Sequence, residues 1–281
     1  MRVPVTLRVP AGGALAAAKA LGAAGVPALA LEPPERGGDY PSDTAQLGTV
    51  GAPVLAMVAP EPRDAREVLG LSHPEPAARR KVVAAAESVV PLASALRCRR
   101  VIMGVGRPGW STTVADARAS RAQFRREREA LAIDLLRVLH PLVRRHAGIV
   151  WHLLPTDGGA SALDVETFGW IVGELPAIRL ALDSGMTAVG EASGGDRMET
   201  WLDAHESALG FVFLSDHDGR GNIVLPGCGV GSTAGLRGVL GGARPRALRP
   251  PSGASFDDVV ASAEECAERF QLAGDADAWR A

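Results

Sequence analysis

The chain has 281 residues, of which 47% are hydrophobic and 22% charged, so it can form two domains or one large barrel. Lysine and arginine number 30 against 32 aspartates and glutamates, a formal net charge of −2. This balance excludes the chain-wide basic surface typical of nucleic-acid-binding proteins. No stretch approaches the roughly 20 apolar residues of a membrane span. The first ten residues show no signal-peptide pattern, so we expect no such leader.

Cysteine usage indicates a reducing compartment. Cys98, Cys228 and Cys266 are the three cysteines, an odd number without CxxC spacing, which does not build a disulfide framework. We therefore expect a cytoplasmic protein.

Short apolar β-rich segments alternate with Ala- and Leu-rich segments along the chain. We expect strands at residues 3–9, 26–33, 53–60, 99–106, 149–155, 177–185, 209–217 and 246–250. We expect helices at residues 12–25, 74–98, 119–148, 163–175, 196–208 and 256–271, and a glycine-rich loop with a short helix after the seventh strand. Pro91 is expected to kink the second helix.

This rhythm predicts the α/β class and a single (β/α)8 TIM barrel, because eight βα units in about 270 residues match that fold. No linker rich in Pro, Gly or Ser divides the chain. We expect one domain over residues 1–272 and a C-terminal tail over 273–281. The loop at residues 33–41 is expected above the barrel mouth.

A glycine motif after the fourth strand is a candidate for dinucleotide binding. Residues 104–109, GVGRPG, fit the pattern G-x-G-x-x-G. The motif should open a helix directly within a βαβ unit of about 30 residues. Here the hydrophobic periodicity predicts that the next helix begins only near residue 118 and is itself nearly 30 residues long. A plain loop of a barrel is therefore favoured for residues 104–109.

Four segments of the chain resemble the xylose-isomerase-like TIM barrels, which include sugar-phosphate isomerases and epimerases and the related AP-endonuclease-type barrels. The segments are HPEPAARRKVVAAAESVVPLASALRCRRVIMGVG, LPAIRLALDSG, LGFVFLSDHDGRG and VLPGCGVG. They resemble the family's arginine-marked helix before strand four, its strand-six Leu-x-Leu-Asp-x-Gly-His, its strand-seven His-Leu-x-Asp and its Pro-Gly-x-Gly loop.

The resemblance implies a divalent metal at the C-terminal mouth, held by Glu, Asp, His and Glu from strands five to eight. Asp183 stands at the strand-six position, but Leu154 and Phe213 stand at the positions of strands five and seven. The strand-eight position falls on Arg249 or Leu248. Leucine and phenylalanine cannot replace oxygen or imidazole ligands, so we expect no cofactor and no metal site of the usual form.

Four residues remain as catalytic candidates at the mouth. Asp183 is a candidate base or substrate ligand, with a helix-capping or other structural role as the alternative. Asp216 and His217 end strand seven, and His217 is the histidine whose ordinary pKa suits proton transfer. Glu32 ends strand two, where barrel enzymes often carry catalytic groups. Solvated loop positions are the alternative for His217 and Glu32.

Further residues are candidates for substrate binding. His152 lies one layer below Leu154 on the same strand, either as a core histidine or as a site residue. The glycine-rich loop at residues 227–235 could bind an anion through backbone amides. The substrate-binding candidates are His152, Arg107, Arg249, Gly227, Gly229 and Ser232.

Two functions follow as hypotheses. The first is a sugar-phosphate isomerase- or epimerase-like enzyme acting on a polyhydroxylated or phosphorylated small molecule without the usual metal. The second is a non-catalytic barrel that binds a sugar-like ligand or a partner protein, because fold alone does not fix function. Conventional metal-dependent activity remains only if the strand alignment is shifted. In each case we expect no nucleic acid and no membrane partner.

Overall fold

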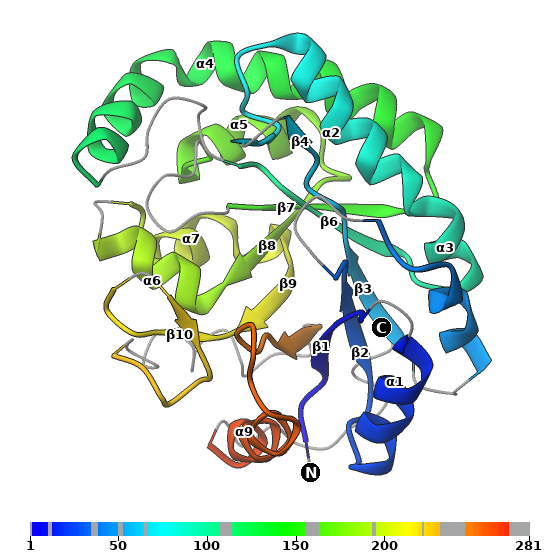
Figure 1. The fold of residues 1–281 in the computed structure, drawn as a ribbon. Helices are drawn as coiled ribbons and strands as arrows, with labels where there is room; N and C mark the ends of the chain where they lie inside the picture. The colour runs from blue at the N-terminus through cyan, green and yellow to red at the C-terminus, as the bar shows by residue number, and fades with distance from the viewer. Residues whose placement is uncertain are drawn as a thin grey trace.

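The computed structural model describes residues 2–10, 13–34, 39–49, 53–64, 67–106, 114–155, 163–192, 195–220, 222–230 and 245–269. Eight parallel strands form a closed barrel, with helices around its outside (Figure 1). Around the barrel the strands are β1 (Val5–Arg8), β2 (Leu29–Glu32), β3 (Val54–Val58), β6 (Arg100–Gly104), β7 (Val150–Leu154), β8 (Arg179–Asp183), β9 (Leu209–Leu214) and β12 (Arg246–Leu248). The predicted (β/α)8 barrel is therefore confirmed.

The outer layer is helical, and two of the connecting loops contain a small β-hairpin. The helices are α1 (Ala14–Ala23), α2 (Pro76–Ser88), α3 (Val90–Ala95), α4 (Val114–Arg145), α5 (Val165–Glu174), α6 (Ser184–Ala192), α7 (Met198–His205) and α9 (Phe256–Arg269), with 3-10 helices η1 (Ser42–Thr49) and η2 (Glu206–Ala208). The hairpins pair β4 (Arg63–Asp64) with β5 (Glu67–Val68) and β10 (Asp216–His217) with β11 (Ile223–Val224). No helix in these described ranges is both long and apolar enough to cross a membrane.

The strands are apolar on both faces because both faces are covered. Phe211 and Phe213 fill the barrel interior together with small residues such as Ala30, Ala181 and Ala247. A second apolar cluster lies between the strands and the helices. Along each strand, alternate residues therefore point into the barrel, and those near the carboxyl ends reach the mouth.

Several predicted boundaries were wrong. The helix predicted at residues 74–98 is two helices that meet at Val89, with Pro91 in the first turn of α3 rather than at a kink. Helix α4 begins at Val114, five residues before the predicted start. The strand predicted to reach His217 ends at Leu214, and the chain then enters the β10–β11 hairpin. Helix α6 was not predicted.

Other predictions fall outside the described ranges. The short helix expected after the glycine-rich loop, and the tail expected at residues 273–281, fall on residues outside those ranges. The loop expected above the mouth is described only at its two ends. At its far end, the Tyr40 hydroxyl lies 2.8 Å from the Leu31 carbonyl oxygen and 2.9 Å from that of Val58, so Tyr40 links the ends of β2 and β3.

The loop after the β4–β5 hairpin packs against the end of β6 at a glycine. A Cβ atom built on Gly70 would lie 2.5 Å from the Val105 carbonyl oxygen and 2.6 Å from the Gly106 Cα. These are backbone atoms, so no side-chain movement can relieve the contact. Two loops at the mouth therefore depend on this glycine for their close approach.

We predict that Gly70→Ala lowers the free energy of unfolding by about 1–3 kcal/mol, the usual cost of overpacking. Urea denaturation followed by circular dichroism measures it. Gly148→Ala is the matched control, because a Cβ at Gly148 has no neighbour within 4 Å. Equal unfolding midpoints for the two variants would contradict the prediction.

Candidate functional site

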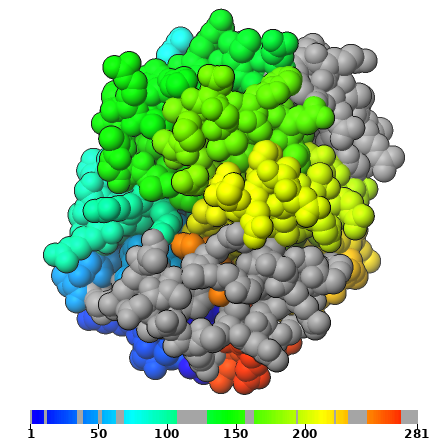
Figure 2. Space-filling view, turned by 180° about the vertical axis from the view of Figure 1, so that it is seen from behind, coloured from blue at the N-terminus to red at the C-terminus, as the bar shows by residue number. Residues whose placement is uncertain are grey.

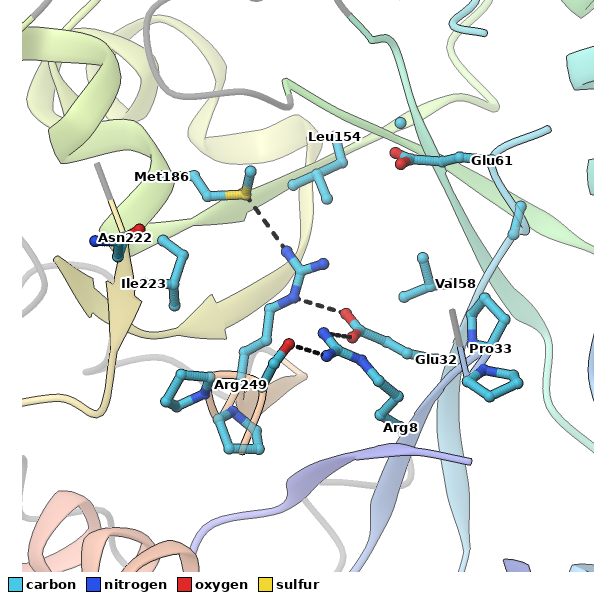
Figure 3. Close-up of a pocket in the computed structure, with 16 residues that line it drawn as sticks. Arg8, Glu32, Pro33, Val58, Glu61, Leu154, Met186, Asn222, Ile223 and Arg249 are labelled. Atoms are coloured by element: carbon cyan, nitrogen blue, oxygen red, sulfur yellow. Dashed lines mark hydrogen bonds and ion pairs between the residues drawn. The ribbon is translucent and has the colours of Figure 1, made fainter. Parts of the chain in front are cut away.

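The mouth of the barrel is organised around Arg249, which follows β12. Its backbone N–H donates to the Leu214 carbonyl at the end of β9, 2.8 Å away. Its side chain then runs across the mouth. Nε lies 2.6 Å from Glu32 Oε1, and Nη1 donates to Asp183 Oδ2 at 2.9 Å (Figure 3 draws the first contact). The first contact is a close ion pair whose angles are not those of a hydrogen bond.

The surroundings of Arg249 keep it charged. Its guanidinium carbon lies 4.9 Å from the centre of the Phe213 ring, and Nη1 lies 3.5 Å from the Met186 sulfur. Burial alone would lower the pKa of Arg249, but the charges of Glu32 and Asp183 outweigh burial and raise it. The site therefore contains a permanent cation.

A buried hydrogen-bond network fixes Asp183. Its Oδ1 accepts from the Ser215 hydroxyl at 2.5 Å and from the Met186 backbone N–H at 3.1 Å, which caps helix α6. Ser215 and Ser184 bond each other twice: Ser215 N donates to the Ser184 hydroxyl at 2.9 Å, and that hydroxyl donates to the Ser215 carbonyl at 2.6 Å. The carboxylate is thus held toward Arg249.

Space near this network admits only glycine. The Gly185 backbone N–H donates to the Ser215 hydroxyl at 3.0 Å. A Cβ on Gly185 would lie 2.5 Å from both the Ser215 hydroxyl oxygen and the Asp216 carbonyl oxygen. The start of α6 consequently packs directly on the end of β9.

Glu32 contacts two arginines. It ends β2 and is 5% exposed. Its Oε2 lies 3.5 Å from Arg8 Nη2, and Arg8 Nη1 in turn bonds the Ser252 hydroxyl (Figure 3). Arg8 ends β1, which lies between β2 and β12, so this set of charges comes from three neighbouring strands.

A cavity of about 610 Å³ opens beside these groups. Its charged wall contains Arg8, Glu32, Glu61 and Arg249, which Figure 3 shows around a common space. The apolar part of the lining is Pro33, Pro34, Val58, Ala59, Leu154, Met186, Ile223, Pro250 and Pro251. In Figure 2 an orange part of the chain, the colour that the bar gives to β12 and the residues after it, is visible at the surface between teal and yellow parts. The cavity can therefore bind a small molecule with both polar and apolar faces.

The structure places Asp216 and His217 beside this cavity, outside its lining. Asp216 Oδ1 accepts from the His217 backbone N–H at 2.7 Å, and Oδ2 accepts from the N–H groups of Gly227 and Gly229 at 3.3 and 3.2 Å. The two amides predicted to bind an anion are thus used by a carboxylate of the chain. The His217 side chain is buried, and its Nδ1 accepts from the Gly219 N–H at 3.2 Å.

His152 lies inside the barrel, one layer below Leu154. It is 1% exposed, and its Nδ1 donates to the Val150 carbonyl at 3.1 Å. Burial lowers the pKa of His152 from its usual 6.5 to about 4, with Arg100 and Arg179 adding to the effect. His152 is therefore a neutral core residue in the structure and does not line the cavity.

The remaining predicted residues divide in two. Arg107 and Ser232 lie outside the described residues. Leu154 and Phe213 belong to the cluster inside the barrel, at the ends of β7 and β9. Of the two residues proposed for strand eight, Arg249 lines the cavity, whereas Leu248 packs in the cluster between strands and helices. Across the described ranges, no three His, Cys, Asp or Glu side chains gather as a metal site.

Sequence analysis missed four contributors: Arg8, Glu61, Ser215 and Ser252. Arg8 and Glu61 come at or shortly after strand ends, which is a usable signal in a barrel. Ser215 and Ser252 also follow strand ends, but their roles depend on partners far apart in the sequence, which this signal does not identify.

Comparisons with known proteins identify the fold. No family model and no curated protein matches the sequence. Solved structures match over nearly the whole chain. A D-tagatose 3-epimerase-like protein has a TM-score of 0.69 at 14% identity, covering 97% of this chain and 98% of its own. The chain therefore has the fold of the xylose-isomerase-like TIM barrels.

Two further barrels of this kind are similar. The 3-keto-D-glucoside 4-epimerase of E. coli has a TM-score of 0.64 at 12% identity, covering 96% of this chain and 99% of its own. The IolI protein, solved with a bound zinc atom, has a TM-score of 0.68 at 13% identity, covering 98% and 100%. At these identities the likeness establishes the fold alone.

We predict that Ser215→Ala lowers the free energy of unfolding by about 1–3 kcal/mol, because the buried Asp183 Oδ1 loses one of its two hydrogen bonds and the buried Gly185 N–H loses its acceptor. Chemical denaturation measures the change. The control is Ser207→Ala, at an exposed serine of η2. A Ser215→Ala variant as stable as this control would show that the network contributes nothing.

We also predict a pH dependence from His152. Its pKa is lower in the folded chain than in the unfolded one, so the unfolded chain binds more protons between pH 6.5 and about 4. Stability is full above pH 6.5 and falls, by an amount on the order of 3 kcal/mol, as the pH drops to about 4.

Replacing His152 by leucine should flatten this part of the stability profile. Urea unfolding at pH 7, 5.5 and 4.5 measures it. His140→Gln, at an exposed histidine of α4, should keep the wild-type slope. A His152→Leu profile parallel to wild type would refute the assignment.

Proposed function

We propose that the chain is a sugar isomerase- or epimerase-like enzyme that acts on a polyhydroxylated or phosphorylated small molecule in the mouth cavity, without the divalent metal usual in such barrels. The supporting observation is the Arg249 guanidinium, which lies between Glu32 and Asp183 in the wall of the cavity. The likeness in fold to sugar epimerases supports the substrate class. We propose no nucleic-acid or membrane partner and a cytoplasmic location.

With Arg249 in place, the residues at the mouth do not fit a divalent metal. Leu154 and Phe213 offer no oxygen or nitrogen donor at the ends of β7 and β9. The two carboxylates nearest the centre already contact a guanidinium, whose positive charge repels a second cation. The proposed reaction therefore contains no metal-dependent step.

Arg249 can act as the electrophilic group. Within the described residues its Nη2 makes no hydrogen bond, so those N–H groups are available to a ligand oxygen. Hydrogen bonds from a fixed cation stabilise the negative charge that develops on a carbonyl oxygen when the neighbouring carbon loses a proton. Asp183 accepts a hydrogen bond from Arg249 but does not line the cavity, so its proposed role is to position Arg249.

Glu32 is the candidate base. Its carboxylate lines the cavity beside Arg249. In the proposed step it takes the proton from the carbon next to the substrate carbonyl, and the electron pair forms an enolate held by Arg249. Return of this proton from Glu32 to the neighbouring carbon of an enediol gives an isomer. An epimer forms instead when a water molecule in the cavity donates a proton to the other face of the first carbon and the proton on Glu32 passes to solvent.

A non-catalytic binding barrel is the second candidate. The observation that favours it is the engagement of both carboxylates: Glu32 contacts Arg8 and Arg249, and Asp183 accepts hydrogen bonds on both of its oxygens. Both carboxylates therefore already have partners within the chain and can serve to hold Arg249 in place. Such a barrel would bind a sugar-like ligand without changing it.

Deuterium exchange distinguishes the two candidates. We predict that the protein, incubated in D2O with EDTA and a panel of ketoses, aldoses and their phosphates, incorporates deuterium next to the carbonyl of at least one compound, as seen by NMR. Glu32→Gln should slow this exchange by about 100-fold or more. Glu265→Gln, at an exposed position of α9, is the control and should exchange at the wild-type rate.

Other outcomes decide against catalysis. A ligand-induced rise in melting temperature with no exchange in any compound supports the binding barrel. Neither exchange nor a thermal shift across the panel rejects both candidates.

A further inference from the structure

We propose that Arg249 is the resident cation of the mouth, and that removing its charge leaves Glu32 and Asp183 able to bind a divalent cation in its place. This inference deepens the proposed function, since it names the group that supplies positive charge to the substrate. Its test uses no sugar, so its failure and the failure of the proposed function are distinguishable.

Two buried carboxylates lie against the Arg249 guanidinium. Glu32 and Asp183 are 5% and 1% exposed, and they approach Arg249 from β2 and β8, on opposite sides of β12 around the barrel. Two buried carboxylates that contact the same guanidinium need its positive charge, because their desolvation is otherwise uncompensated. The guanidinium meets this need with two different nitrogen atoms, Nε and Nη1.

One oxygen of each carboxylate depends on Arg249 for its compensation. Asp183 Oδ1 is occupied by Ser215 and by the Met186 N–H, so only Oδ2 faces Arg249. Glu32 Oε1 is buried and has no hydrogen-bond partner, although it lies 2.6 Å from Arg249 Nε. Loss of the guanidinium therefore leaves one uncompensated oxygen on each carboxylate.

Ions can reach the position of the Arg249 side chain from the cavity, and the Met186 sulfur lies close to it. Arg249 lines the cavity of about 610 Å³, so water and ions can reach the space that its side chain fills. The Met186 sulfur, 3.5 Å from Nη1, is a third donor near the same point. Two carboxylate oxygens with water suit Mn²⁺ or Mg²⁺, and an added thioether sulfur favours softer ions.

The experiment compares Arg249→Gln with wild type after both are stripped with EDTA and titrated with MnCl₂. We expect Arg249→Gln to bind about one Mn²⁺ per chain by calorimetry. Its melting temperature should rise by about 5–10 °C at a Mn²⁺ concentration near 100 times the Kd. Wild type should show neither effect. A folded Arg249→Gln variant that binds no Mn²⁺, Mg²⁺ or Zn²⁺ would overturn the proposal.

Two control variants distinguish the effect of losing the charge of Arg249 from the effect of losing an arginine elsewhere in the chain. Arg137→Gln removes an exposed arginine that is also paired with a carboxylate, that of Asp134, and should not respond to Mn²⁺. Arg249→Lys keeps a cation in the mouth and should also not respond. Metal binding by either variant at the Arg249→Gln affinity would count against a role for the Arg249 charge.

The proposal stays testable if the Arg249→Gln variant does not fold without metal. If Arg249→Gln is unfolded in EDTA, recovery of its circular dichroism on adding Mn²⁺ supports the proposal, and failure to recover with any of the three ions counts against it. An independent measurement uses wild type labelled with [¹³C-methyl]methionine, because Met186 contacts Arg249. Stoichiometric Mn²⁺ should leave the Met186 methyl signal sharp, and its selective broadening would overturn the proposal.

Discussion

The mouth of the barrel depends on one buried cation held by two carboxylates. A charged group removed from water is costly unless an opposite charge and hydrogen bonds compensate it. Arg249, Glu32 and Asp183 meet this condition together. Truncation of Arg249 would leave two buried negative charges, and truncation of either acid would leave the cation partly unpaired.

The surrounding structure serves this arrangement. Ser184 and Ser215 join the ends of β8 and β9 and turn Asp183 toward the centre. Arg8 contacts the outer oxygen of Glu32, and the Phe213 ring lies under the guanidinium. Helix α6 uses the same aspartate as its cap, so the position of a helix and the direction of a site residue depend on one side chain.

The barrel could be predicted from sequence because its strands are long apolar runs at regular spacing. The ends of β7, β9 and β12 could be predicted as well, since alternation along a strand fixes which residues point inward. The surroundings of Asp216 and His217 could not. A two-residue hairpin strand has no periodicity of its own, and it is defined by its pairing with Ile223 and Val224.

The same limit explains the network behind Asp183. Ser215 and Ser184 are 31 positions apart, and neither differs in sequence from an ordinary loop serine. Helix α6 was missed because Ser184 and Gly185, poor helix formers, directly follow the strand. Arg249 could be placed at the strand end, but its two partners depend on the closure of the barrel, which brings β2 and β8 to either side of it.

A guanidinium at the centre of a barrel mouth differs from a spherical ion in being flat and covalently attached. Its remaining N–H groups lie in one plane, so an oxygen atom is bound only from directions that this plane allows. Two sides of Arg249 are taken by Glu32 and Asp183, and one face lies over Phe213. A ligand must therefore approach from the cavity side and edge-on, which restricts its orientation before any other contact forms.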